Sequence, residues 1–96
     1  MTEHLPSITV LVPGLLRDCC ASRPEVDLHA TNMRELLSEM ERNYPRLHRN
    51  ICDETGAVRR HVNLFVNTHN MRDCEGMDTP LAPGDTVTIL PAVSGG

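Results

Sequence analysis

The chain has 96 residues, a formal net charge of −4 and 23% charged residues, a composition that suits one soluble domain with its own core. Arg59-Arg60 is the only adjacent basic pair and aromatic residues make up only 2%, which disfavours a nucleic-acid-binding surface. No apolar run approaches the roughly 20 residues that span a bilayer. Because residues 1–4 also lack a secretion-signal pattern, we expect a cytoplasmic protein.

The first two expected elements are strands. Residues 8–12 form an apolar, β-branched run that favours a strand buried on at least one face, and Pro13-Gly14 ends it. After a polar connection, residues 26–30 alternate between apolar and polar side chains, with the period of a strand that has one wet face. His29 lies on the polar side of this strand, where a surface role is more common than a catalytic one.

The strongest helix signal begins at Asn32, which can cap the helix, with Glu35 three residues later completing a capping-box-like pair. Apolar side chains recur at helical spacing, at Met33, Leu36, Leu37, Met40 and Tyr44. Such a stripe can line a partner groove, but at this spacing we favour the core. Pro45 disfavours helical geometry at the residue before it, so the main helix should end there, and residues 47–51 should add a further turn.

A third strand is expected after a polar loop in which Gly56 makes the tight turn. Residues 61–67 alternate, which places Val62, Leu64 and Val66 on one face. Phe65, the only phenylalanine, lies on the opposite face and is a candidate for a contact surface. Residues 68–70 are expected to form a turn, followed by a short extended piece at residues 71–72.

The last strand leads directly into the C-terminal tail. A Pro-Gly-Asp turn at residues 83–85 precedes the β-branched run 86–90, and Pro91, which lacks a backbone donor, should end the sheet ladder. The tail from residue 91 to residue 96 reaches roughly 20 Å if extended. Its last two residues, Gly95 and Gly96, have no Cβ to obstruct a narrow channel. The tail therefore resembles a substrate for the active site of another protein.

The order of these elements is strand, strand, helix, strand, short strand, strand. One helix packed on one face of a mixed sheet, with the first and last strands adjacent, is the β-grasp arrangement of the α+β class. We expect a single domain over residues 1–96, with 91–96 as its flexible C-terminal tail.

The cysteines indicate neither a disulfide framework nor a metal site. Cys19 and Cys20 are neighbours and poorly placed to bridge each other, and with Cys52 and Cys74 they form no Cys-x-x-Cys pair. His48 lies four residues before Cys52, so the two would share a helix face. Two ligands fall short of the four that a structural zinc site takes, so we expect reduced thiols and no metal.

Several stretches taken together resemble the ThiS/MoaD family of ubiquitin-like sulfur carriers, over almost the full length. They are Val-Pro-Gly-Leu-Leu-Arg at 12–17, Met-Arg-Glu-Leu-Leu at 33–37, His-Val-Asn-Leu-Phe-Val-Asn at 61–67, Asp-Thr-Pro-Leu at 78–81, Gly-Asp-Thr-Val-Thr-Ile-Leu-Pro at 84–91 and the final Gly-Gly. Within this family the chain looks most similar to the CysO-type carriers, with the molybdopterin synthase small subunit next. The Thr-His-Asn sequence at 68–70 departs from the Gly- or acid-containing turn expected there.

The resemblance implies that the chain is a carrier acted on by enzymes rather than an enzyme. An ATP-dependent activating partner, which uses ATP and Mg, would adenylate the Gly96 carboxylate, and sulfur would then convert it to a thiocarboxylate. Ala92, Val93, Ser94 and Gly95 would enter the partner's active site. The chain itself would bind no cofactor, and its side chains show no Ser-His-Asp or Cys-His spacing that supports catalysis.

The resemblance leaves the sulfur acceptor open. A pyridoxal-phosphate-dependent cysteine synthase, with a metalloprotease that releases cysteine, is the first expectation. The large subunit of molybdopterin synthase is the alternative. A ubiquitin-like modifier joined to proteins through Gly96, or a plain interaction domain, are other functions that the sequence allows. The sheet face that carries Phe65 and Leu90 is the expected docking surface for partners.

Overall fold

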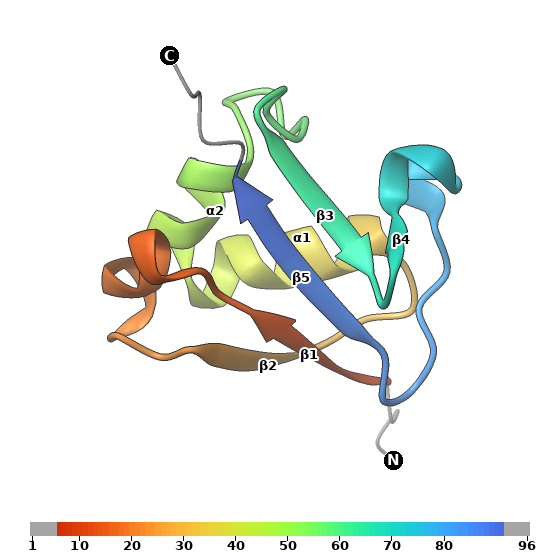
Figure 1. The fold of residues 1–96 in the computed structure, drawn as a ribbon, viewed down its shortest axis with the longest axis horizontal. Helices are drawn as coiled ribbons and strands as arrows, with labels where there is room; N and C mark the ends of the chain where they lie inside the picture. Colours follow the sequence, from red (N-terminus) through yellow and green to blue (C-terminus); the bar gives the residue numbers. More distant parts are fainter. Residues whose placement is uncertain (1–5, 92–96) are drawn as a thin grey trace.

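The computed structural model describes residues 6–91. Figure 1 shows a sheet whose α-helices pack on one of its faces. The strands are β1 Ser7–Leu11, β2 Glu25–His29, β3 Val62–Val66, β4 His69–Asn70 and β5 Thr86–Pro91. The helices are α1 Met33–Asn43 and α2 Pro45–Ile51, with short 3₁₀ helices η1 Gly14–Cys20, η2 Met71–Asp73 and η3 Gly76–Asp78. None of the helices described is long and apolar enough to cross a membrane.

The sheet is mixed, and its strand order is β2-β1-β5-β3-β4. β1 and β5 are parallel neighbours, with Val10 opposite Val87. β5 is antiparallel to β3, and β2 and β4 are antiparallel edge strands beside β1 and β3. The first and last strands are therefore adjacent in the centre of the sheet, which confirms the predicted β-grasp arrangement.

α1 begins where the sequence places its cap. The side chain of Asn32 accepts a 2.8 Å hydrogen bond from the backbone N–H of Glu35. The Glu35 carboxylate returns to Thr31, one residue before the cap, where it accepts from the N–H at 2.8 Å and the hydroxyl at 2.6 Å. These bonds from Thr31 lower the pKa of Glu35. α1 ends at Asn43 and α2 begins at Pro45, because proline is tolerated in the first turn of a helix but not in its interior.

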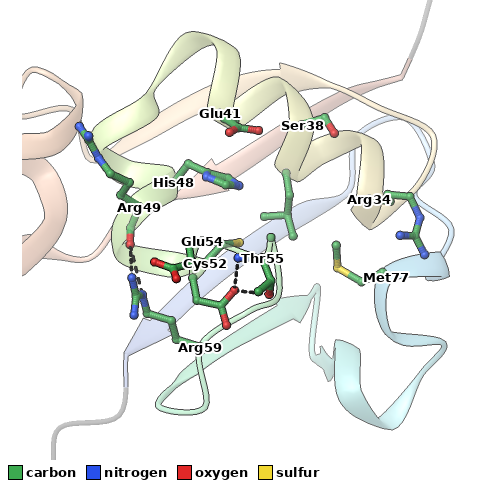
Figure 2. Close-up of a pocket in the computed structure, with 13 residues that line it drawn as sticks. Arg34, Ser38, Glu41, His48, Arg49, Cys52, Glu54, Thr55, Arg59 and Met77 are labelled. Atoms are coloured by element: carbon green, nitrogen blue, oxygen red, sulfur yellow. Dashed lines mark hydrogen bonds between the residues drawn. The ribbon is translucent and has the colours of Figure 1, made fainter.

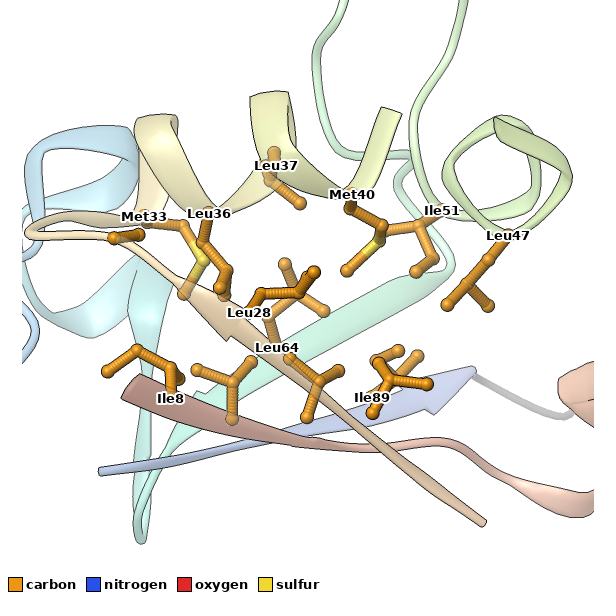
Figure 3. Close-up of a cluster of buried hydrophobic side chains, with 14 of the residues drawn as sticks. Ile8, Leu28, Met33, Leu36, Leu37, Met40, Leu47, Ile51, Leu64 and Ile89 are labelled. Carbon is orange, nitrogen blue, oxygen red and sulfur yellow. The ribbon is translucent and has the colours of Figure 1, made fainter. Parts of the chain in front are cut away.

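The core lies between the helices and the inner face of the sheet, as Figure 3 shows. From α1, Met33, Leu36, Leu37 and Met40 are all at most 2% exposed, which confirms that the apolar stripe is core. α2 adds Leu47 and Ile51, and the sheet contributes alternate residues of β1, β2, β3 and β5. The core residues among those described extend from Ile8 to Ile89.

Three local predictions were wrong or incomplete. The hairpin turn is made by Asn67 and Thr68, with Asn67 at φ 57°, and the extended piece is β4 at residues 69–70. Residues 71–72, predicted as extended, begin η2. The connection after β1 contains η1, whose end is marked by left-handed Ala21. Short 3₁₀ turns leave little periodicity in a sequence because they last barely one turn.

Candidate functional site

The site is the end of β5, from which the chain continues into the predicted tail. β5 extends one residue further than expected, because Pro91 still lies opposite Val62 of β3, and the strand ends there. The residues predicted to carry the sulfur or to enter the partner's active site follow directly in the sequence. All five lie outside the described residues: Ala92, Val93, Ser94, Gly95 and Gly96. Their roles stay predictions. The structure supplies the direction and the surroundings of the strand that carries them.

Other elements reach the same end of the sheet. β1 is parallel to β5, so η1 follows β1 at the end where β5 stops. The Arg17 Nε donates a 3.1 Å hydrogen bond to the Val12 carbonyl, which ties η1 back to the end of β1. The amide of Asn50 in α2 donates at 3.4 Å to the Cys19 sulfur, which links α2 to η1. β5 thus ends at the same end of the sheet as β1, where η1 begins, and η1 is in turn linked to α2.

The open face of the sheet carries an apolar patch next to this end. Leu11 and Phe65 both lie opposite Thr88, and Leu90 lies two residues further along β5 on the same face. We call these four residues the open-face patch. Leu90 is 47% exposed and Leu11 37% exposed, whereas Phe65 is half-buried rather than fully exposed.

The structure therefore brings together the two docking residues that the sequence predicted, Phe65 and Leu90, and adds Leu11. The alternation within β1 contained the signal for Leu11, because Ile8 and Val10 point inward and the residues between them point outward. Leu15 in η1 is 79% exposed and had no such signal, since η1 itself was not predicted. The docking role of the patch remains a prediction.

A separate cleft of about 560 Å³ lies on the helix side, between α1, α2 and the loop that follows α2. Figure 2 shows His48 and Cys52 at its floor, with Arg34, Arg49 and Glu41 around its rim. Its rim carries charges of both signs, and the open-face patch lies on the other face of the sheet. The two faces therefore offer different chemistry, one mixed in charge and one apolar.

Cys52 and Asp53, which line this cleft, do not have the properties of an activated nucleophile and base. Burial, with the nearby Asp53 carboxylate as a second cause, raises the pKa of the Cys52 thiol to about 11, so the nucleophilic thiolate is scarce at neutral pH. The Asp53 carboxylate accepts a 2.5 Å hydrogen bond from the Thr55 hydroxyl, and this bond lowers the pKa of the carboxyl. Within residues 6–91 no group of three or more His, Cys, Asp or Glu side chains is placed to hold a metal ion, and the four cysteines are free thiols.

Comparison with known proteins places this geometry in a family. The family model of the ThiS family matches residues 10–96. The sulfur carrier protein CysO of Mycobacterium tuberculosis is 35% identical over 92 residues, which cover 94% of this chain and 99% of that protein. Small archaeal modifier protein 3 of Haloferax volcanii is 35% identical over 71 residues, which cover 74% of this chain and 75% of that protein.

A solved structure agrees with these sequence matches. The crystal structure of the Amycolatopsis orientalis BexX/CysO complex contains a chain that superposes with a TM-score of 0.84 at 29% identity, over 93% of this chain and 99% of that one. The family match begins within β1 and runs through β5 to Gly96. The chain belongs to the ThiS family.

Proposed function

We propose that the chain is a sulfur carrier whose cargo is bound at the Gly96 carboxylate. The observation that carries this proposal is the central position of β5, which leads straight from the sheet into Ala-Val-Ser-Gly-Gly. A strand paired on both sides gives the tail a fixed starting point, and five extended residues reach about 17 Å beyond it. The sulfur carrier protein CysO, similar to this chain over 94% of its length, supports the same role.

The chemistry explains why the tail needs partners. A carboxylate is a poor acyl donor, because attack by sulfur would have to expel oxide. An ATP-dependent activating enzyme, with Mg, transfers AMP to a Gly96 carboxylate oxygen and releases pyrophosphate. A sulfide or persulfide sulfur then attacks the carbonyl carbon and AMP leaves; a persulfide adduct additionally needs reductive S–S cleavage by a thiol. The resulting thiocarboxylate is a soft, anionic sulfur nucleophile, and this chain supplies no catalytic group of its own.

Cysteine synthesis is the destination we propose for the sulfur. A thiocarboxylate adds readily to an electron-poor alkene such as the aminoacrylate held by a pyridoxal-phosphate enzyme, and acyl transfer to nitrogen would leave a cysteine that a metalloprotease could release. The similarity to CysO supports this destination over the dithiolene of molybdopterin. Because the reaction uses ATP and reduced sulfur, we place it in the cytoplasm.

A second candidate function, protein modification through Gly96, has specific support from the similarity to small archaeal modifier protein 3. Both functions start from the same acyl-adenylate and differ in whether sulfur or an amine attacks it. All nine basic residues of the chain are arginines, so it offers no lysine amine to its own activated end. Because it has no lysine to which a second copy could be joined, a modifier of this kind would add single copies to its targets and would not form chains of copies.

Intact-mass measurement of the chain from cells that contain its partners tests the proposal. We expect a fraction of the protein in which sulfur replaces one oxygen of the terminal carboxylate, and we expect this fraction to disappear when ATP is depleted. Heavier species, each one target protein plus one copy of the chain, would favour modification instead. A terminus that always remains an ordinary acid would contradict both functions.

The open-face patch supplies the docking prediction. Replacing Leu90, which is 47% exposed, by Asp should lower the rate of activation at low carrier concentration at least tenfold, because a charge would have to be desolvated against the partner. Stability should change by less than about 1 kcal/mol, as for other exposed positions. The measurement is ATP–pyrophosphate exchange by the activating enzyme.

His29→Asp is the matched control for this variant. His29 is also exposed on the open face, but it lies opposite Ser7 at the far side of the sheet, away from the patch. The His29→Asp variant introduces the same carboxylate and should leave ATP–pyrophosphate exchange unchanged. Equal losses in the two variants would show that added negative charge, and not the patch, controls activation.

A further inference from the structure

The last two residues of β5, Leu90 and Pro91, pair with one neighbouring strand only. β1 stops pairing with β5 at Leu11, which lies opposite Thr88. This pairing places the Ile89 N–H at the Leu11 carbonyl, so β1 still supports Ile89. Beyond it β3 continues alone, with residues 63 and 62 opposite Leu90 and Pro91. The orientation of the strand end from which the tail leaves therefore depends on the first residues of β3.

Those first residues of β3 have no strand on their other side. β4 is only two residues long and pairs with Phe65 and Val66. The side chain of Arg72 occupies the position that a longer β4 would fill. Its Nη1 donates to the Val62 carbonyl at 2.9 Å and to the Asn63 Oδ1 at 2.8 Å, and its Nη2 donates to the Arg59 carbonyl at 3.0 Å.

The guanidinium is itself held in place. The Asn70 side chain accepts a 2.9 Å hydrogen bond from the Arg72 backbone N–H and donates at 3.2 Å to the Asn63 Oδ1 that Arg72 also contacts. The Arg59 carbonyl, which receives one arm of the guanidinium, also receives the Val62 N–H at 3.0 Å. The rigid, planar fork of arginine suits three acceptors at once, whereas a lysine ammonium has no fixed geometry to match them.

We propose that Arg72 is a positioning residue for the C-terminal tail. By fixing residues 59–63, it fixes the part of β3 that alone supports Leu90 and Pro91, and so sets the direction in which the chain leaves the sheet. The inference rests on the proposed function, in which Gly96 must enter a partner's active site. Arg72 lies at the surface, so its effect is concentrated on the strand end rather than on the core.

Amide hydrogen exchange of the free carrier tests the structural half of the proposal. In Arg72→Met the amide of Leu90, which faces Asn63 of β3, should exchange at least about tenfold faster, because opening of the strand end then has fewer charge-assisted hydrogen bonds to break. The amides of Val87 and Ile89, which face β1, should keep their rates. Unchanged exchange at Leu90 would overturn the proposal.

Arg60→Met is the matched control. Arg60 is exposed, adjacent to Arg59 in the chain, and makes no side-chain hydrogen bond or ion pair in the described part of the structure. Its replacement removes the same charge from the same end of the sheet. Exchange at Leu90 should stay at the wild-type rate, and an equal acceleration in this control would assign the effect to charge rather than to the guanidinium contacts.

Activation kinetics test whether Arg72 affects adenylation of the chain. The assay uses the activating enzyme that adenylates the wild-type chain, and the readout is ATP–pyrophosphate exchange. Arg72→Met should lower kcat about three- to tenfold with KM for the carrier within about twofold, because a displaced tail lowers the productive fraction without altering the docking face. Arg72→Lys should retain an intermediate kcat. A wild-type kcat in Arg72→Met, or a change in KM alone, would overturn the positioning role.

The two ideas fail in different ways. If the wild-type chain is never adenylated, the proposed function fails, while the exchange experiment still shows whether Arg72 fixes the strand end. If the wild-type chain is adenylated and Arg72→Met behaves like it, only the positioning role fails.

Discussion

Deletion of Gly96 should abolish activation of the chain while leaving its fold intact. The shortened chain ends in the carboxylate of Gly95, which is withdrawn by one residue, or about 3.3–3.6 Å when extended. A displacement of about 1 Å can cost 10²-fold when a reacting group must meet a fixed site, so we expect activation to fall by at least about 10²-fold. ATP–pyrophosphate exchange measures this loss directly.

The stability of the shortened chain should stay within about 0.5 kcal/mol of the wild type, as for changes away from a core. The core residues of the described chain lie between Ile8 and Ile89, so none of them is removed. Urea unfolding curves check this expectation. A shortened chain that is activated as well as the wild type would show that the cargo is not bound at the terminal carboxylate of Gly96.

Gly96→Ala separates the position of the carboxylate from the shape of the tip. This variant keeps the chain length and adds one methyl group, which should hinder a narrow partner channel and lower activation less than the deletion does. Gly14→Ala is the control, because a Cβ at Gly14 meets no atom within 4 Å. The control adds the same methyl group at a position that is not part of the tail and should be activated normally.

The elements that positioned the site were predictable because they are periodic. The helical spacing from Met33 to Met40 and the alternation around Leu64 each bury one face, and burial of that face fixes the element and its register. The Asn32 cap was predictable because its partner lies only three residues away. These elements predicted that the first and last strands are adjacent, and the structure supplies the full order, with β5 in the centre.

The remaining features depend on contacts between residues that are distant in sequence or on turns too short to show a period. Arg72 contacts Arg59 and Val62, which lie 13 and 10 residues earlier, and no spacing rule marks an arginine that replaces a strand. The hairpin turn was displaced by one residue because Asn67, and not a glycine, adopts the positive φ angle. The open-face patch needed the register between β1, β5 and β3, which only the structure provides.

Leu37→Ala should lower the stability far more than any of the tail or surface variants. Leu37 is 2% exposed on the inner face of α1, and truncation of such a leucine removes buried apolar surface and leaves a cavity. We expect a loss of about 2–5 kcal/mol, which corresponds to a fall in Tm of roughly 8–40 °C for a domain of this size. Urea and thermal unfolding measure it, and activation should be retained at temperatures where the variant is folded.

Leu15→Ala is the matched control, because the same side chain is truncated where it is 79% exposed, and it should cost less than about 0.5 kcal/mol. Leu36→Ala refines the expectation further. Leu36 is 0% exposed, whereas Leu37 also lines the cleft between α1 and α2, where water can enter the space that truncation leaves. Leu36→Ala should therefore cost more than Leu37→Ala. Equal losses from Leu37→Ala, Leu15→Ala and deletion of Gly96 would contradict a core that is independent of the tail.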